Sequence, residues 1–206
     1  MNLSRRYAEA HFPDRWTVLG VRLHSLTIGH ALLLQRVGSP FAPYYENAQE
    51  AAPGLGDVLL ALFILSRPAQ VAADAIGTRR FRLLMWYWSA RFKLSVALHP
   101  VKVLSIPTAA AKLVSYIVAG TDGPGVSPVG QFDGQAPGTP AIARLIRTLC
   151  GCLGRTMPEA LATPITLAHW DCAAWWEREG SARIDLLDID ALTAEVKAEL
   201  AAGRQN

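Results

Sequence analysis

The chain has 206 residues, of which 51% are hydrophobic and 18% are charged, so it is apolar for a protein in water. This length is enough for one ordinary domain with a core of its own. The longest uninterrupted apolar run, residues 58–65, is far shorter than the roughly 18–20 residues of a membrane-spanning helix. We therefore expect no membrane span.

Charge is distributed unevenly along the chain. Residues 1–120 hold 13 basic and 6 acidic side chains, whereas residues 121–206 hold 7 basic and 11 acidic ones. No acidic residue lies between Asp74 and Asp122, although that stretch contains seven basic residues. A basic part and an acidic part can attract each other within one molecule, or between molecules that stack head to tail.

The cellular compartment is indicated by the N-terminus and the cysteines. Arg5 and Arg6 are followed by polar residues and not by the apolar stretch of an export signal. The chain has three cysteines, an odd number, which favours reduced thiols. We therefore expect a cytoplasmic protein.

The predicted elements begin with a short strand over residues 16–25, where apolar and polar side chains alternate. This strand needs a partner, either elsewhere in the chain or on another subunit. The remaining patterns predict helices, with Thr27, Asp57 and Asp188 as N-caps. The expected fold is mainly α, a helical domain with one or a few short strands near the N-terminus. The predicted helices cover residues 28–37, 58–66, 68–76, 79–98, 105–119, 140–149, 164–179 and 188–203.

A Gly/Pro-rich flexible loop is predicted over residues 121–139, because six glycines and four prolines lie between positions 120 and 140. It separates a basic helical part, residues 1–120 with the N-terminal strand, from an acidic C-terminal helical part, residues 140–206. We expect the two parts to form one domain overall.

The helix predicted over residues 79–98 has two apolar faces, so we expect it to be largely buried. The remaining stripe carries Arg82 and Trp86. The first apolar face consists of Phe81, Leu84, Met85, Trp88 and Phe92, and the second of Leu83, Tyr87, Ala90 and Leu94.

The same helix also suggests an alternative function. Basic and aromatic side chains over residues 79–112 are typical of proteins that bind nucleic acid or a membrane surface. In the structural alternative, the helix is buried and its Arg and Lys side chains reach water through their aliphatic stems. The second apolar face favours burial, so we expect no nucleic acid as a partner.

A metal-dependent enzyme is the third and least favoured possibility. Cys150, Cys152, His169 and Cys172 are ligand types that hold zinc. Their spacing, C-x-C followed by H-x-x-C, is not a familiar zinc motif, and His169 and Cys172 share a helix face with Trp176, which is typical of a core. The chain contains none of the common catalytic motifs. We therefore expect no enzyme activity, no catalytic residues, no cofactor and no metal.

Three tryptophans lie within seven residues of the helix predicted over 164–179, and they cannot all face one core. We expect Trp176 to be in the core and Trp175 to be exposed, on a surface shared with the last predicted helix, which would pair with this one as a hairpin. Tryptophan and arginine are frequent hot spots of protein interfaces. The candidate partner-binding residues are Trp170, Trp175, Trp86 and Arg82.

A family resemblance is carried by three stretches: VLGVRLHSLTIGHALLLQRVGSPF (residues 18–41), GDVLLALFILSRP (residues 56–68) and AHWDCAAWWEREG (residues 168–180). They resemble a set of poorly characterised proteins encoded in the tail modules of phages and prophages, in the position of a tail assembly chaperone. The resemblance does not include the Gly/Pro-rich loop or the Cys-Gly-Cys sequence, and it carries no catalytic residue. It implies a non-enzymatic assembly or scaffold-type protein in the host cytoplasm. Its partners would be other tail proteins, of the tape-measure or tail-tube type, or further copies of itself.

Overall fold

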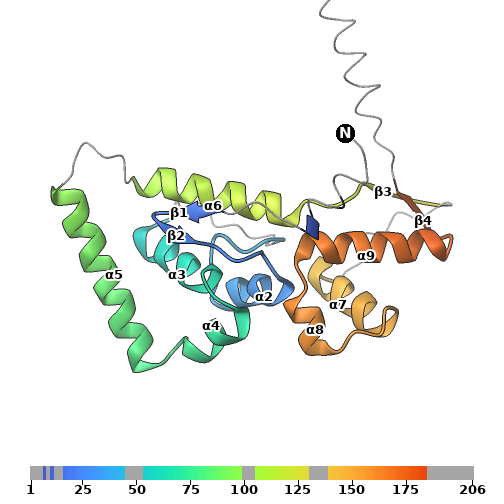
Figure 1. Ribbon diagram of the computed structural model, residues 1–206, viewed down its shortest axis with the longest axis horizontal. Coiled ribbons are helices and arrows are strands. Elements are labelled where there is room, and N and C mark those ends of the chain that lie inside the picture. The colour runs from blue at the N-terminus through green and yellow to red at the C-terminus, as the bar shows by residue number, and fades with distance from the viewer. Residues whose placement is uncertain are drawn as a thin grey trace, which may run out of the picture.

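The predicted mainly helical fold is confirmed, with two short antiparallel pairs of strands, one of them near the N-terminus (Figure 1). The structure is a computed structural model that describes residues 7, 10–11, 16–44, 53–98, 105–129 and 139–184. The helix predicted over 188–203 and residues 130–138 of the predicted Gly/Pro-rich loop lie outside the described residues.

The helices and strands follow the predicted order closely. The helices are α2 (Ile28–Arg36), α3 (Leu55–Leu65), α4 (Ala69–Ala75), α5 (Arg79–Leu98), α6 (Ile106–Thr121), α7 (Ala141–Gly151), α8 (Met157–Ala162) and α9 (Ile165–Arg178). The strands are β1 (Thr17–Val18), β2 (Val21–Arg22), β3 (Val126–Pro128) and β4 (Ala182–Ile184).

The prediction of one continuous N-terminal strand is wrong, because the chain turns back on itself in the middle. Strands β1 and β2 pair with each other in a hairpin. Leu19 and Gly20 form the turn with φ angles of 51° and 78°, and two successive positive φ values are typical of the tight turns that join hairpin strands. The strand's partner is therefore its own second half, and no other subunit is needed.

Two further boundaries differ from the prediction. Helix α3 begins at Leu55, and Asp57 is not its N-cap but caps from within the first turn: its Oδ2 accepts a hydrogen bond from the Gly54 amide at 2.8 Å. Helix α8 was not predicted, although Thr156 and Glu159 form its capping box. Their T-x-x-E spacing is typical of the start of a helix.

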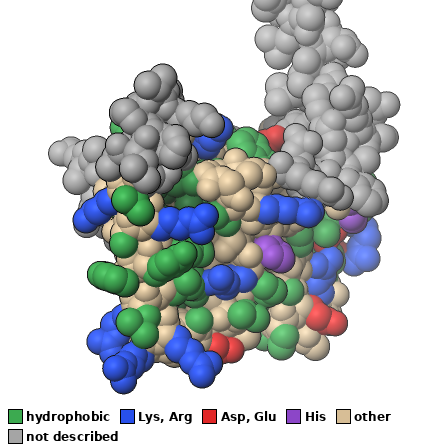
Figure 2. Space-filling model, turned by 60° about the vertical axis from the view of Figure 1, so that its left-hand side comes forward, with side chains coloured by type: hydrophobic (Ala, Val, Ile, Leu, Met, Phe, Trp, Pro, Cys, Tyr) green, Lys and Arg blue, Asp and Glu red, His purple; other side chains and the backbone are tan. Residues whose placement is uncertain are grey.

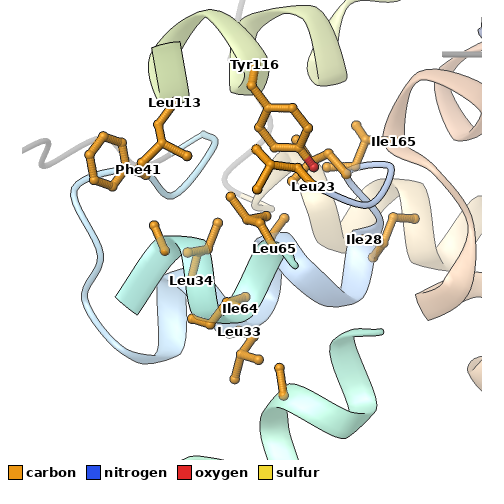
Figure 3. Packing of buried hydrophobic residues seen from close by; sticks show 14 of the residues in the cluster. Leu23, Ile28, Leu33, Leu34, Phe41, Ile64, Leu65, Leu113, Tyr116 and Ile165 are labelled. Carbon is orange, nitrogen blue, oxygen red and sulfur yellow. The ribbon is translucent and has the colours of Figure 1, made fainter. Parts of the chain in front are cut away.

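Helix α3 lies at the centre of the hydrophobic core. Seven of its residues are buried, and it contacts α2, α4, α5 and α6. Figure 3 shows Ile64 and Leu65 of α3 beside Leu34 of α2, with Leu113 of α6 on the far side of Leu65 in the same cluster. A helix that is apolar on all sides must be covered on all sides, so the surrounding helices are arranged around this one.

A buried histidine joins the start of α2 to the end of α3. His30 is 1% exposed, its Nδ1 accepts a hydrogen bond from the Thr27 amide at 3.2 Å, and its Nε2 lies 2.8 Å from the Arg67 carbonyl oxygen. Since Nδ1 accepts, Nε2 carries the proton and donates. Thr27 is the N-cap that the sequence predicts, and its Oγ1 in turn accepts from the His30 amide at 3.3 Å.

The part of the chain after the Gly/Pro-rich loop shares this core. The Ile28 amide donates to the Thr163 carbonyl at 3.1 Å, and the Ile165 amide donates to the Leu26 carbonyl at 2.9 Å. Leu149 and Ile165 belong to the same cluster of buried residues as α3. Strands β3 and β4, which the sequence did not indicate, pair the chain that leaves α6 with the chain that leaves α9.

Acidification should destabilise the fold through His30. Burial lowers the pKa of His30, so the folded chain keeps this side chain neutral, whereas the unfolded chain binds a proton near pH 6.5. Stability is therefore complete above about pH 6.5 and is lost as the pH falls below it. Urea denaturation at pH 7.5 and pH 5.5 measures this loss.

The variants His30→Gln and His24→Gln assign the loss to a side chain. The loss should shrink in His30→Gln, whereas His24→Gln should change it much less, because His24 is exposed and adds only a minor part to the lowered pKa of His30. Part of the loss should persist in both, because burial also lowers the pKa of His169. An equal loss in wild type and His30→Gln would show that His30 is not its source.

Candidate interaction surface

The surface that stands out is the outer side of α5, and it depends on how the inner side is fixed. Thr78 Oγ1 accepts a hydrogen bond from the Phe81 amide at 3.1 Å, which caps the start of the helix. Phe81 and Trp88 then pack edge to face on Phe63 of α3, with ring centroids 4.8 and 6.4 Å apart. The first apolar face of the predicted helix therefore packs against the core, as expected.

The second apolar face of α5 is exposed, so the prediction that this helix is largely buried is wrong. The reason is its position: α5 lies at one end of the described structure, where α3 is its main neighbour and covers one side only (Figure 1). Four large side chains face solvent, and their exposed fractions are 60% for Leu83, 71% for Trp86, 52% for Tyr87 and 61% for Leu94.

Basic side chains border these apolar residues on both sides. Arg82 and Lys93 flank the stripe next to Trp86, and Arg80 and Arg91 flank it next to Tyr87, as helical spacing requires. Among the described residues, none of these four forms an ion pair. Figure 2, which brings this end of the molecule forward, shows green hydrophobic side chains interspersed with blue basic ones and little red. We call this surface the α5 outer face: Leu83, Trp86, Tyr87 and Leu94 with Arg79, Arg80, Arg82, Arg91 and Lys93.

The tryptophans of α9 offer less surface than Trp86 of α5. Trp170 is 8% exposed, and Tyr7 packs edge to face on it with ring centroids 5.7 Å apart. Trp175 and Trp176 are both half-buried, and Trp176 packs against the core. Of the four candidate partner-binding residues, Trp86 and Arg82 are therefore the exposed ones.

The candidate metal ligands do not combine into a binding site in the described part of the chain, where no group of three or more His, Cys, Asp or Glu side chains is placed to hold an ion. Cys152 is exposed, Cys150 is half-buried and Cys172 is buried. Burial raises the pKa of the Cys172 thiol to about 12, which disfavours the thiolate that a ligand or nucleophile requires.

His169 instead makes a long-range contact that the sequence did not indicate. The Tyr44 hydroxyl lies 2.6 Å from His169 Nε2 and forms a hydrogen bond with it, and burial raises the pKa of Tyr44 to about 12, so the phenol stays protonated. Gly123 packs so closely that an added Cβ would lie 2.8 Å from the Cβ of His169. Tyr44 has a φ of 59°, which is unusual for a residue with a side chain. These contacts hold the loop after α2 and the chain after α6 against α9.

A second accessible feature is a groove of about 810 Å³ between α2, α4 and α8. Its walls are mainly apolar, with Leu32, Ala73 and Leu161 among them, and His24 and Arg36 add polar groups. Gly29 lies at its base, where an added Cβ would meet the Leu161 carbonyl oxygen at 3.0 Å, so this glycine permits the close approach of α2 and α8.

Comparison with protein-family models, with curated proteins and with solved structures finds no match for this chain. Among the described helices, none combines the length and the apolar character needed to cross a membrane.

The two tryptophans on opposite sides of α5 should respond differently to truncation. Trp86→Ala should change the free energy of unfolding by less than about 0.5 kcal/mol, because its indole is exposed. Trp88→Ala should lower it by about 2–3 kcal/mol, because the packing on Phe63 is lost. Urea denaturation of the two variants measures both values. Equal losses would mean that α5 is covered on both sides.

Proposed function

We propose that this chain is a non-enzymatic assembly or scaffold-type protein of phage tails, and that it binds other tail proteins through the α5 outer face. The observation that carries the proposal is the exposure of Trp86 and its apolar neighbours on a helix that is otherwise firmly packed. Contiguous apolar surface rimmed by polar residues is typical of binding sites. The protein would act in the host cytoplasm, holding apolar segments of tape-measure or tail-tube proteins until the tail polymerises.

The composition of the α5 outer face suits a protein partner. Tryptophan, tyrosine and arginine are the residues most enriched among interface hot spots, and this face carries all three types side by side. Its basic rim would steer an acidic partner towards the apolar stripe and would disfavour basic ones. A partner segment with an apolar stripe and acidic flanks therefore fits best.

The family resemblance supports the class of function rather than the binding surface. Its stretches coincide with the first hairpin and α2, with α3, and with α9, all of which contribute to the core. Helix α5 lies outside those stretches. The resemblance therefore bears on the scaffold, and the proposal for the binding surface rests on the exposure and charge of α5.

A second candidate is binding to nucleic acid or to an anionic membrane surface through residues 79–112. The sequence argued against it because α5 was expected to be buried, and that reason no longer holds. The observation in its favour is the row of exposed basic residues around Trp86. The first candidate is preferred over nucleic acid because four apolar side chains on the same face would gain nothing from phosphate contacts. It is preferred over a membrane surface because the family resemblance points to protein partners.

The binding proposal can be tested on Trp86. We expect the purified chain to bind the tape-measure or tail-tube protein encoded beside its own gene, and Trp86→Ala to weaken this binding by roughly 2 kcal/mol, about thirtyfold in Kd. Isothermal titration calorimetry measures both. Val71→Ala, at an exposed apolar residue on α4, is the matched control and should bind like wild type. Equal binding by Trp86→Ala and wild type would remove α5 from the interface.

The second candidate can be tested by measuring binding to DNA and to anionic vesicles. We expect no sub-micromolar complex with double-stranded DNA at physiological salt, because the apolar stripe interrupts the basic residues that would contact phosphates. We expect none with vesicles containing phosphatidylserine either, because salt screens the basic residues of the α5 outer face and only four apolar side chains there could enter the headgroup region. Fluorescence anisotropy and vesicle co-sedimentation measure these affinities. A tight complex that Arg82→Glu or Lys93→Glu weakens would instead make this candidate the preferred one.

A further inference from the structure

We propose that the α5 outer face of one copy binds the C-terminal acidic segment, residues 185–206, of a second copy of this chain, head to tail. This inference rests on the proposed function, since it names a partner for the same face. The C-terminal acidic segment lies outside the described residues, and the features that match the α5 outer face are those of its sequence.

The charges of the two surfaces are complementary. The C-terminal acidic segment has five acidic residues and two basic ones, whereas α5 has five basic residues and no acidic one. Opposite charges of this number steer association and select the partner's orientation. The basic residues of α5 are displayed on an exposed helix face, where an acidic segment can reach them.

The apolar patterns match as well. The sequence predicts a helix over 188–203 with one stripe formed by Ile189, Leu192, Val196 and Leu200. At helical spacing, Asp188, Glu195 and Glu199 border one side of that stripe. Such a helix would lay its apolar stripe on Leu83, Tyr87 and Leu94 and place its carboxylates beside the basic rim. Sixteen helical residues extend about 24 Å, which fits within the roughly 30 Å of α5.

The position of residue 184 favours a second copy over the same chain. Strand β4, where the described chain ends, lies at the opposite end of the molecule from α5 (Figure 1). Helix α6, about 24 Å long, runs between these ends. Residues 185–187, which precede the predicted helix, extend at most about 10 Å. A neighbouring copy can bring its α5 to the segment without this restriction.

Each copy then carries one donor segment and one acceptor face. Two copies can exchange their segments, or several copies can form a chain, because the contact joins different surfaces. Because a tail protein would use the same face, self-association and binding of that protein exclude each other.

The test uses full-length variants that each lack one half of the contact. Arg82→Glu with Trp86→Ala removes the acceptor face, and Leu192→Ser with Val196→Ser removes the donor stripe. By sedimentation velocity, wild type should associate reversibly at micromolar concentration, more weakly in 0.5 M salt, and each variant alone should be monomeric, with its Kd raised at least tenfold. An equimolar mixture of the two variants should form a one-to-one dimer, because it contains one intact face and one intact segment. Arg147→Glu, at an exposed basic residue on α7, should associate like wild type.

Several results would overturn the inference. A monomeric wild type, association that survives in either variant, or a mixture that stays monomeric would each exclude this contact. The proposed function fails separately: if self-association follows the predicted pattern but no tail protein binds, the proposed function is lost and the inference stands. If tail proteins bind through Trp86 and wild type is monomeric, the inference is lost and the proposed function stands.

Discussion

The structure depends on one helix that has no polar side. Helix α3 buries Val58, Leu59 and every residue from Ala61 to Leu65, and leaving these side chains in water would cost about 1.5–3 kcal/mol for each large one. Four helices surround it as a result, each contributing the face that matches. Even the carbonyl of Arg67 just after α3 is withdrawn from water, and His30 supplies the donor that it needs. The same demand fixes α5, since Phe63 needs Phe81 and Trp88 beside it.

Covering α3 uses one side of α5 and leaves the other unoccupied. A helix whose inner face packs on an aromatic ring cannot rotate to hide its outer face without losing that packing. Leu83, Trp86 and Leu94 are therefore held in solvent by the same contacts that complete the core. Exposure of this kind is a property of a rigid surface rather than of a loose segment, and a rigid apolar surface loses little conformational entropy when a partner binds.

The sequence predicts the local features of this fold well, because periodicity and caps are local. Thr27 caps α2 and the stripe of Phe81 and Trp88 faces the core, both as predicted. Features that depend on distant residues were missed. Alternation over residues 16–25 is the same for one strand as for a hairpin that turns at Leu19, and a second apolar face on α5 does not reveal whether the core or a partner covers it. The contact of Tyr44 with His169 joins positions far apart in sequence and has no local signature.

Buried polar groups in the described part of the chain are paired, and the buried titratable side chains with the clearest shifts are neutral. No buried side-chain nitrogen or oxygen there lacks a hydrogen-bond partner. Burial raises the pKa of Tyr44 and Cys172 and lowers that of His30 and His169, so all four are held in their neutral forms near pH 7. The apolar and basic side chains of the α5 outer face, in contrast, are exposed, and a partner can reach them.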